Sequence, residues 1–430
     1  MSIRYVSLKA LQRPPRSDTQ DSGSCLPLLD HAGESLSPMQ KVRPDVERLA
    51  QALGATTKAN DYGEYLAVRC WCAQPSRHSP DNRALKLLLP EASDVIADPD
   101  QWLFLDTETT GLAGGSGTYA FLVGLAWWEG GGLEIEQLFM REYSEERSLL
   151  FALRERIAER PVLVTFNGKS FDWPLLETRF RMSRKISVPT PRAHLDFLHP
   201  ARNLWRLRLG SVRLSELERH VLGWDRGVDL LSGLIPQIYF DYLRGGRPER
   251  LVPVLNHNQM DLRGLAALSS RILSLLSDAE SLGQDGLELF GVSRICEKRG
   301  QDIRARTLYE KSIASFLPTE TDRVARRSLA RLAKRQGDFN LACELWKDAL
   351  GNSRHGYEAY EQLAIYYERT ARDPERAEQI VHQALDELRR AIQIGDIAPG
   401  PYREIKARFE KRMQRLERKT RKPLLDTLTK

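Results

Sequence analysis

Residues 103–111 read LFLDTETTG, and the rest of the chain can be interpreted outward from them. The apolar run at 103–105 predicts a buried strand, and Asp106 and Glu108 follow it directly. Because strand side chains alternate with a period of two, both carboxylates project to one face. Such a pair must share a proton or bind a cation, and its oxygens suit Mg²⁺ or Mn²⁺. A solvated acidic turn is the alternative, since Asp-x-Glu is common by itself.

The composition is that of a folded protein of more than one domain. The chain has 430 residues, 41% of them hydrophobic, which predicts two or three domains. Its longest apolar stretch, 119–128, is much shorter than the roughly 20 residues that span a bilayer, and its start lacks the apolar core of a secretory signal. We therefore expect no membrane span and a cytoplasmic location. Five cysteines without a CxxC pair predict reduced thiols.

The segments before LFLDTETTG predict little function. Residues 1–40 are rich in Pro, Ser, Asp and Gly without periodicity, so we expect them to be disordered. Residues 41–97 contain a helical pattern at 44–53 and an alternating strand at 64–72. We expect them to form a small extension that packs on the next domain.

Residues 98–278 show the element order of an α/β domain. The elements predicted after the first strand are strands at 119–128 and 133–139 joined by a Gly-rich turn, a helix at 145–159 capped by Ser144, a strand at 162–166, a helix from Asp172, a strand at 194–198 and several helices. Three strands in a meander followed by alternating helices and strands is the order of the ribonuclease H-like α/β fold, a mixed sheet with helices on its faces.

Residues 285–425 show only helical patterns, and these repeat. Gly300, Ala305 and Tyr309 are echoed 37 positions later by Gly337, Ala342 and Trp346, and a third copy follows. Periods near 34 are typical of tetratricopeptide-like repeats, which stack helix pairs and can bind a protein partner. An irregular helical bundle is the alternative.

The end of this region is basic. Residues 403–422 carry ten Lys or Arg and three Glu, while the whole chain has a net charge of +6. Such a run can attract nucleic acid. We prefer an amphipathic helix that caps the repeats, because apolar residues recur at helical spacing: Tyr402, Ile405, Phe409, Met413 and Leu416.

A second polar motif is FNGKSFDWP at 166–174, in which a strand ends at Asn167 and Asp172 opens a helix. Ligands of open α/β sheets bind beyond the strand ends, so Asp172 can approach Asp106 and Glu108. The GKS within this motif is not a phosphate-binding loop, because Leu163 stands where that loop requires glycine.

A third polar motif is HNQMD at 257–261, which introduces a helical pattern. Residues four apart share a helix face, so His257 and Asp261 point together. His194 and Asp196 on the last strand could join the same site, but alternation on a short strand explains them as well. We prefer a structural role for those two.

The order Asp-x-Glu, Asn-xxx-Phe-Asp and His-xxx-Asp resembles the DEDD superfamily of exonucleases. More closely, DTETTGLAGGSGTYAFLVG at 106–124 resembles the ribonuclease H-like domain proteins of the YprB type, which pair this domain with tetratricopeptide repeats. The resemblance covers about 100–275, with the repeat region behind it. It implies a 3′-to-5′ exonuclease acting on single-stranded DNA or RNA. The expected ligands of two divalent cations, Mg²⁺ or Mn²⁺, are Asp106, Glu108, Asp172 and Asp261.

The same resemblance implies roles for other residues. His257 would take a proton from the attacking water, although it stands four residues before Asp261, the spacing that the tyrosine branch of the superfamily uses. The residues expected near the terminal nucleotide are Thr107, Thr110, Gly111 and Asn167. Two alternatives remain open: an endonuclease or structure-specific nuclease on the same fold, and an inactive scaffold whose repeats bind a protein partner.

Overall fold

The computed structural model describes residues 46–73, 81–111, 117–227, 229–282, 285–350 and 357–428. The expected disorder of residues 1–40 lies outside these ranges. Pro44–Lys430 forms one compact unit. The described cysteines, Cys70, Cys72, Cys296 and Cys343, are free, as predicted. Among the described helices, none is both long and apolar enough to cross a membrane.

A mixed sheet of seven strands lies within the described residues. Its strands are β1 Thr56–Asn60, β2 Gly63–Ala73, β3 Trp102–Thr109, β4 Ala120–Glu129, β5 Gly132–Phe139, β6 Val162–Thr165 and β7 Ala193–Asp196. The spatial order is β1-β2-β5-β4-β3-β6-β7. Strands β3, β4 and β5 form the predicted antiparallel meander, while β6 pairs parallel with β3 and β7 parallel with β6. The ribonuclease H-like sheet is therefore confirmed, and β1, which was not predicted, extends its far edge through β2.

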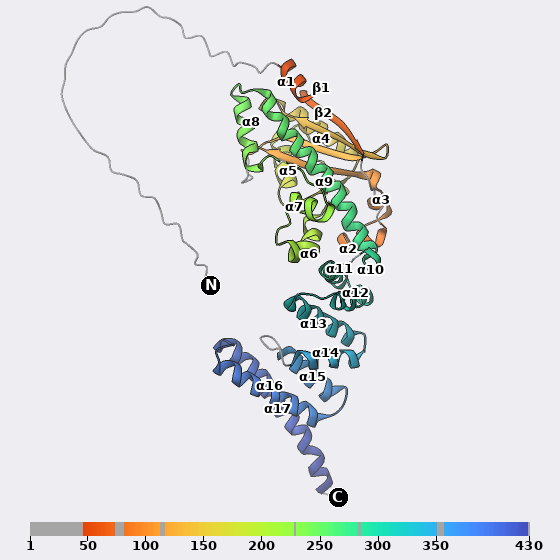
Figure 1. Ribbon diagram of the computed structural model, residues 1–430, viewed down its shortest axis with the longest axis vertical. Helices are drawn as coiled ribbons and strands as arrows, with labels where there is room; N and C mark the ends of the chain where they lie inside the picture. The colour runs from red at the N-terminus through yellow and green to blue at the C-terminus, as the bar shows by residue number, and fades with distance from the viewer. Residues whose placement is uncertain are drawn as a thin grey trace, which may run out of the picture. The chain divides into compact units, whose positions relative to one another are not determined.

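Helices cover both faces of this sheet. They are α1 Val46–Leu53, α2 Asn82–Leu88, α3 Asp94–Ala97, α4 Glu146–Glu159, α5 Asp172–Ser183, α6 Leu198–Leu209, α7 Leu214–Leu217, α8 Ile235–Leu243, α9 Val252–Ser277 and α10 Ala279–Leu282. Trp102 and Phe104 pack on one face with α6 and α9, whereas Leu103 and Leu105 pack on the other with α4 and α5. Figure 1 shows α9 lying across the sheet. The strand alternation read from the sequence thus divides the core into two layers.

Two local predictions are wrong. Ser144 does not cap α4, because a short 3₁₀ turn, Tyr143–Glu145, precedes the helix and the Ser144 hydroxyl donates to Glu142 instead. The last strand ends at Asp196 and not at 198. The Asp196 carboxylate accepts the backbone N–H of Leu198 at 3.0 Å, which turns the chain into α6.

The C-terminal part is all helical, as predicted. Its helices are α11 Gly286–Lys298, α12 Asp302–Ala314, α13 Thr319–Arg335, α14 Phe339–Ala349, α15 Tyr357–Arg369, α16 Pro374–Gln393 and α17 Pro399–Leu428. Gly300 and Gly337 have φ of 72° and 79° in the turns inside the first two helix pairs, and Arg372 has φ of 54° in the third. The 37-residue echo therefore follows a repeated left-handed turn. Assignment to the tetratricopeptide class and the predicted domain boundaries stay predictions.

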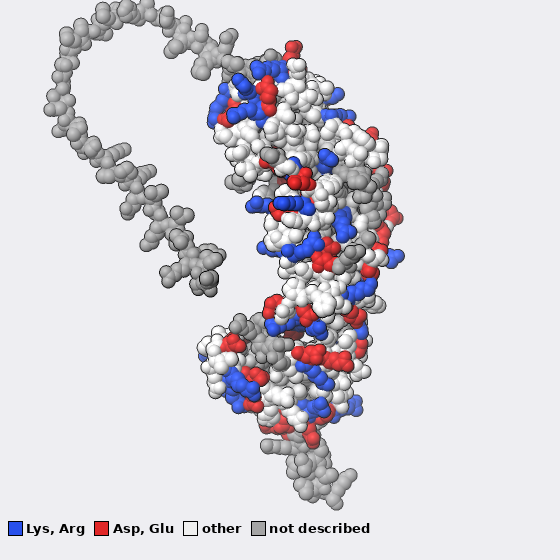
Figure 2. Space-filling view, viewed as in Figure 1, with Lys and Arg blue, Asp and Glu red and all other residues white. Residues whose placement is uncertain are grey.

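The basic helix α17 packs through the predicted apolar stripe. Phe409, Met413 and Leu416 are buried against α15 and α16. Three of its basic side chains, Arg412, Arg415 and Lys419, form ion pairs with the buried Glu368 of α15. These contacts give three of the ten basic residues at 403–422 a structural role. On the face seen in Figure 2, basic and acidic side chains are intermixed.

Candidate active site

The first two carboxylates of the site, Asp106 and Glu108, lie on the part of β3 that continues beyond its parallel neighbour β6. Asp106 and Glu108 pair with Gly124 and Leu122 of β4, so the strand continues through both. The pairing of β3 with β6 ends at Phe104. Strand β3 therefore extends past the end of β6. Asp106 and Glu108, which point to the same face of the sheet, lie where an open α/β sheet binds its ligands. Both side chains are partly buried.

Asp172, the first residue of α5, lies against the same strand. The Thr107 hydroxyl donates to Asp172 Oδ1 at 2.5 Å, which fixes the start of α5 beside β3. Asp196 holds the preceding loop, because its carboxylate accepts the backbone N–H groups of Asn167 and Lys169, each at 2.9 Å. Asn167 adopts a φ of 71° in that loop. These contacts support a structural role for Asp196, which orients the loop that presents Asp172.

Helix α9 supplies the remaining predicted residues. His257 Nε2 lies 3.6 Å from Asp261 Oδ2, so the two side chains share a face of α9 as expected. The other ring nitrogen, Nδ1, lies 2.7 Å from Asp229 Oδ1. His257 is 6% exposed. The imidazole is therefore held between two carboxylates.

A buried guanidinium links these carboxylates to the rest of the fold. Arg226 Nη2 lies 2.5 Å from Asp261 Oδ1 and 2.6 Å from Glu218 Oε1, and its Nη1 lies 3.0 Å from Asp229 Oδ2. Burial lowers the pKa of Arg226, but Glu218 and Asp261 outweigh burial and raise it overall. Arg226 therefore stays charged and balances part of the local negative charge.

Asn258 holds Asp106 from the side of α9. Its Nδ2 donates to Asp106 Oδ2 at 2.8 Å, and its Oδ1 accepts from Gln137 Nε2 at 2.8 Å. A Cβ at Gly124 would lie 2.1 Å from the Asn258 amide oxygen, so β4 needs glycine there to let α9 approach. Asn258 of α9 therefore links the helix that carries His257 and Asp261 directly to Asp106 of β3.

The electrostatics show that these carboxylates crowd one another. Burial raises the pKa of Asp106 well above its usual range, and Asp261, Glu108 and Asp172 raise it further. Burial and the charges of Asp261 and Asp172 raise the pKa of Glu108 to about 9. Burial also raises the pKa of Asp172 to about 6, although hydrogen bonds from Thr107 and the backbone oppose it. The site holds more negative charge than the neighbouring cations balance.

Hard divalent cations fit this donor set in charge and chemistry. Carboxylate oxygens are their preferred ligands, and a cation would relieve the mutual repulsion of Asp106, Glu108 and Asp172. Within the described ranges, no set of three or more His, Cys, Asp or Glu side chains is already spaced to hold one ion. Arg226, bound to Asp261, supplies part of the positive charge that the site requires.

The residues expected near a nucleotide are partly engaged in local structure. Thr107 binds Asp172, and the Thr110 hydroxyl accepts the backbone N–H of Tyr119 at 2.9 Å. The Gly111 carbonyl accepts the Thr109 hydroxyl at 2.8 Å. Contact of Thr107, Thr110, Gly111 and Asn167 with a substrate stays a prediction.

Sequence reasoning missed Asp229, Arg226, Glu218 and Asn258. Asp229 and Arg226 lie in a Gly-containing loop, WDRG at 224–227 and the residues after it, where a charge pair three residues apart suggests only a solvated turn. Glu218 precedes that loop, with no motif around it. Asn258 was quoted within HNQMD, but nothing in its spacing distinguishes an amide that fixes Asp106.

Comparisons with known proteins match the segment of the chain that carries these residues. Residues 103–273 match the model of the RNase_H superfamily, a range that begins at β3 and ends within α9. The chain is also similar to the uncharacterized protein YprB of Bacillus subtilis, with 30% identity over 287 residues, which cover 66% of this chain and 69% of YprB. The carboxylates of β3, α5 and α9 all lie inside the matched range.

Proposed function

Because this chain belongs to the YprB family and carries a ribonuclease H superfamily domain, we propose that it is a divalent-metal-dependent nuclease. Its reaction would be 3′-to-5′ exonucleolytic hydrolysis of phosphodiesters in single-stranded DNA or RNA. The observation that supports this most strongly is the convergence of Asp106, Glu108 and Asp172 with α9, in a cluster whose pKa values are raised by burial and mutual repulsion. Perturbed carboxylates gathered at a strand end are typical of a catalytic site.

The chain's own residues would divide the work of hydrolysis. Asp106, Glu108, Asp172 and Asp261 would hold two divalent cations, which stabilise the attacking and leaving oxygens of an in-line displacement. The Asp229 carboxylate lies 2.7 Å from Nδ1 of His257, and because a carboxylate accepts hydrogen bonds it favours a proton on Nδ1 and orients Nε2 toward the attacking water. His257 Nε2 would then remove the proton from the attacking water.

Two exposed apolar side chains lie close in sequence to residues of the site and are available to a nucleobase. Phe171, which immediately precedes Asp172, is 61% exposed, and Leu231, two residues after Asp229, is 72% exposed. Aromatic side chains stack on bases without regard to sequence. This supports an unpaired strand as the substrate.

The test is a cleavage assay with Mg²⁺ or Mn²⁺ on matched 3′-end-labelled single-stranded DNA and RNA and on a closed single-stranded circle. We expect nucleotides to be released from the 3′ end while the circle stays intact. Asp106→Asn is the control for a contaminating nuclease. Cleavage of the circle would favour the endonuclease alternative.

One contact favours the alternative of an inactive scaffold. Arg226 binds Asp261 at 2.5 Å, so one of the four expected ligands already has a cation from the chain. An inactive scaffold would show neither cleavage nor divalent-cation binding at this site. An active enzyme would show both, and both would be lost in Asp106→Asn.

A further inference from the structure

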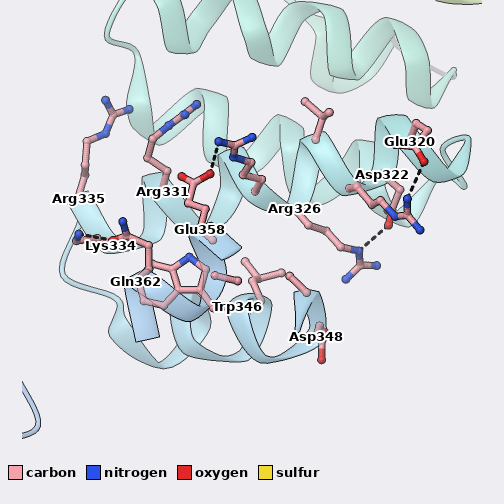
Figure 3. Close-up of a pocket in the computed structure, with 17 residues that line it drawn as sticks. Glu320, Asp322, Arg326, Arg331, Lys334, Arg335, Trp346, Asp348, Glu358 and Gln362 are labelled. Atoms are coloured by element: carbon pink, nitrogen blue, oxygen red, sulfur yellow. Dashed lines mark hydrogen bonds and ion pairs between the residues drawn. The ribbon is translucent and has the colours of Figure 1, made fainter. Parts of the chain in front are cut away.

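The arginines of this chain differ in how many carboxylates they bind. Figure 3 shows the groove between α13, α14 and α15, where Arg326 pairs with Asp322 of the same helix at 2.7 Å. Six cations and four carboxylates line that groove, and Glu297 and Asp302 pair with two of the cations from outside the lining. The charges of the groove therefore balance. Arg226 is different, because its single guanidinium binds three carboxylates.

Two of the three partners of Arg226 anchor it. Glu218 is 2% exposed and is contacted by both Nε and Nη2 of the guanidinium, the second at 2.6 Å. A Cβ at Gly264 of α9 would overlap Glu218 Oε1, so the glycine lets this carboxylate pack against the helix. Asp229 Oδ2 lies 3.0 Å from Nη1. The paired contact with Glu218 and the contact with Asp229 hold the guanidinium in place and balance its charge.

Asp261 is the third partner and the one that can leave. Its Oδ1 lies 2.5 Å from Arg226 Nη2, and its side chain is 20% exposed, whereas that of Glu218 is 2% exposed. If Asp261 turned away, Arg226 would keep both anchoring carboxylates, so its buried charge would stay paired. The loss of this one contact should therefore cost much less than the removal of Arg226, which leaves buried carboxylates without a partner.

Asp261 is also needed to complete the metal site. Its charge raises the pKa values of Asp106 and Glu108, which places it near them. Its two oxygens already face donors of the chain, one at Arg226 and the other 3.6 Å from Nε2 of His257. Among the described residues no three His, Cys, Asp or Glu side chains are spaced to hold one ion. The contact with Arg226 accounts for this, because it directs an Asp261 oxygen away from a shared ion.

We propose that Arg226 is an internal cation that occupies Asp261 in the metal-free protein and releases it when a second divalent ion binds. This inference rests on the proposed nuclease site and adds an order of binding to it. Asp106, Glu108 and Asp172 have no Lys or Arg partner among the described ion pairs, so they would take a first ion without competition. A second ion would compete with Arg226 for Asp261. Arg226 is thus a positioning residue, which acts through Asp261.

The competition sets the size of the expected effect. If Asp261 is released from Arg226 in about one molecule in ten, a second ion binds about tenfold more weakly than it would to an Asp261 without that partner. The protein would then hold one ion at low concentrations of divalent cation and complete its site only at higher concentrations. Cleavage activity should follow the second, weaker step of binding.

Calorimetric titration of the full-length protein with Mn²⁺ measures both steps. The wild type should show a tighter and a weaker site, separated by at least about tenfold in affinity. Arg226→Gln should tighten the weaker site by at least about tenfold, with a smaller change at the tighter site. Arg226→Lys keeps the charge and is the safer variant for folding. It should tighten the weaker site by a smaller factor, because an ammonium lacks the planar fork that reaches Glu218 and Asp261 together.

Two controls separate this contact from a general effect of charge. Arg271→Gln removes the same charge from α9, where Arg271 lies 3.6 Å from the buried Glu288, and it should leave the ratio of the two affinities unchanged. Asp261→Asn should lose the weaker site, so adding Arg226→Gln to it should not change Mn²⁺ binding further. Circular dichroism checks that each variant retains its helices.

Three results would overturn the inference and leave the nuclease proposal standing. The wild type could bind its two ions with equal affinity. The weaker site could be unchanged in both Arg226 variants. Arg271→Gln could tighten the weaker site as much as Arg226→Gln does, which would indicate a general effect of charge. Absence of any Mn²⁺ binding by the wild type would instead overturn both proposals.

Discussion

The carboxylate of Glu368 in the repeat region and the carboxylates around Glu108 in the sheet domain have pKa values shifted in opposite directions. Glu368 of α15 is contacted by Arg412, Arg415 and Lys419 of α17, at 3.1, 2.6 and 2.8 Å. Burial raises its pKa, but hydrogen bonds from Arg415 and Lys419 outweigh burial and bring it to about 2. Glu108 of β3 has a pKa raised to about 9 by burial and by neighbouring carboxylates.

The difference lies in where the chain places its cations. It has 64 Lys and Arg for 58 Asp and Glu, so positive charge is not scarce. The last helix brings three cations to one glutamate. Among the described ion pairs of the four expected metal ligands, the β3 and α5 carboxylates have no Lys or Arg partner and Asp261 has Arg226. Glu368, which three cations of its own chain neutralise, needs no further partner. Carboxylates left to repel one another are suited to a cation from solution.

Substitution of Asp106 should have the largest effect on activity. Asp106→Asn should reduce hydrolysis at least about 10³-fold, because it removes a member of a catalytic unit. It should leave the thermal midpoint unchanged or raise it, since it relieves repulsion in the metal-free site. Glu368→Gln should do the reverse, with full activity and a lower midpoint. Cleavage rates and thermal unfolding of both variants, measured in parallel, check this, and wild-type cleavage by Asp106→Asn would remove Asp106 from the site.

His257 and Asp229 give the next effect. We expect His257→Ala to lower the cleavage rate by roughly 10² to 10⁴, the range for a general base. Asp229→Asn should lower it by about 10- to 100-fold, because Asp229 orients the imidazole without touching the substrate. Asp225→Asn, in the same loop, is the matched control. Equal rates for wild type and His257→Ala across pH 6 to 9 would make His257 structural.

The sequence predicts those features that depend on local pattern. Period-two alternation places Asp106 and Glu108 on one face and divides the sheet core into two layers, and four-residue spacing aligns His257 with Asp261. The contacts that complete the site join positions far apart along the chain. Asn258 reaches Asp106 across 152 positions, and Arg226 reaches Asp261 from an irregular loop with no periodicity. Such contacts depend on tertiary packing, which a single sequence does not display.

Ser144 shows that a local sequence pattern can also mispredict a helix cap. A serine followed by acids is a good helix cap by pattern, yet the Glu142 carboxylate is close enough to accept its hydroxyl and the chain makes a 3₁₀ turn first. The hydrogen bond to the charged Glu142 carboxylate is the stronger of the two that the Ser144 hydroxyl could make. Sequence patterns identify both partners but do not decide between them.

Removing Arg226 would take away the cation that the chain itself supplies to the α9 side of the site. Arg226 is buried, and its loss leaves Glu218, Asp229 and Asp261 without their shared partner. We expect Arg226→Met to lower the free energy of unfolding by about 3–5 kcal/mol in EDTA, the usual cost of breaking a buried pair, with part restored by Mn²⁺. Urea unfolding in both buffers measures this. Arg389→Met, an exposed ion-pair residue, should cost about 0–1 kcal/mol. Equal losses for the two variants would contradict the account.

The pH dependence of Glu368 gives the smallest expected effect. Its folded pKa of about 2 lies below the ordinary 4.5, so its contribution is fully present above pH 4.5 and is lost as pH falls toward 2. We expect that contribution to be on the order of 2 kcal/mol at pH 7. Glu368→Gln should therefore lose stability at pH 7, and its difference from the wild type should shrink at pH 3 and nearly vanish at pH 2. A constant difference between the two proteins from pH 7 to pH 3 would contradict the ion-pair explanation.

If the β3, α5 and α9 carboxylates are arranged for cations from solution, calorimetric titration with Mn²⁺ should detect that binding. The wild type and Glu368→Gln should bind two ions each, as a two-metal site requires, while Asp106→Asn should lose that binding. If the wild type binds no Mn²⁺, or if Asp106→Asn binds it as tightly as the wild type, the carboxylate cluster is not a metal site and the account is wrong.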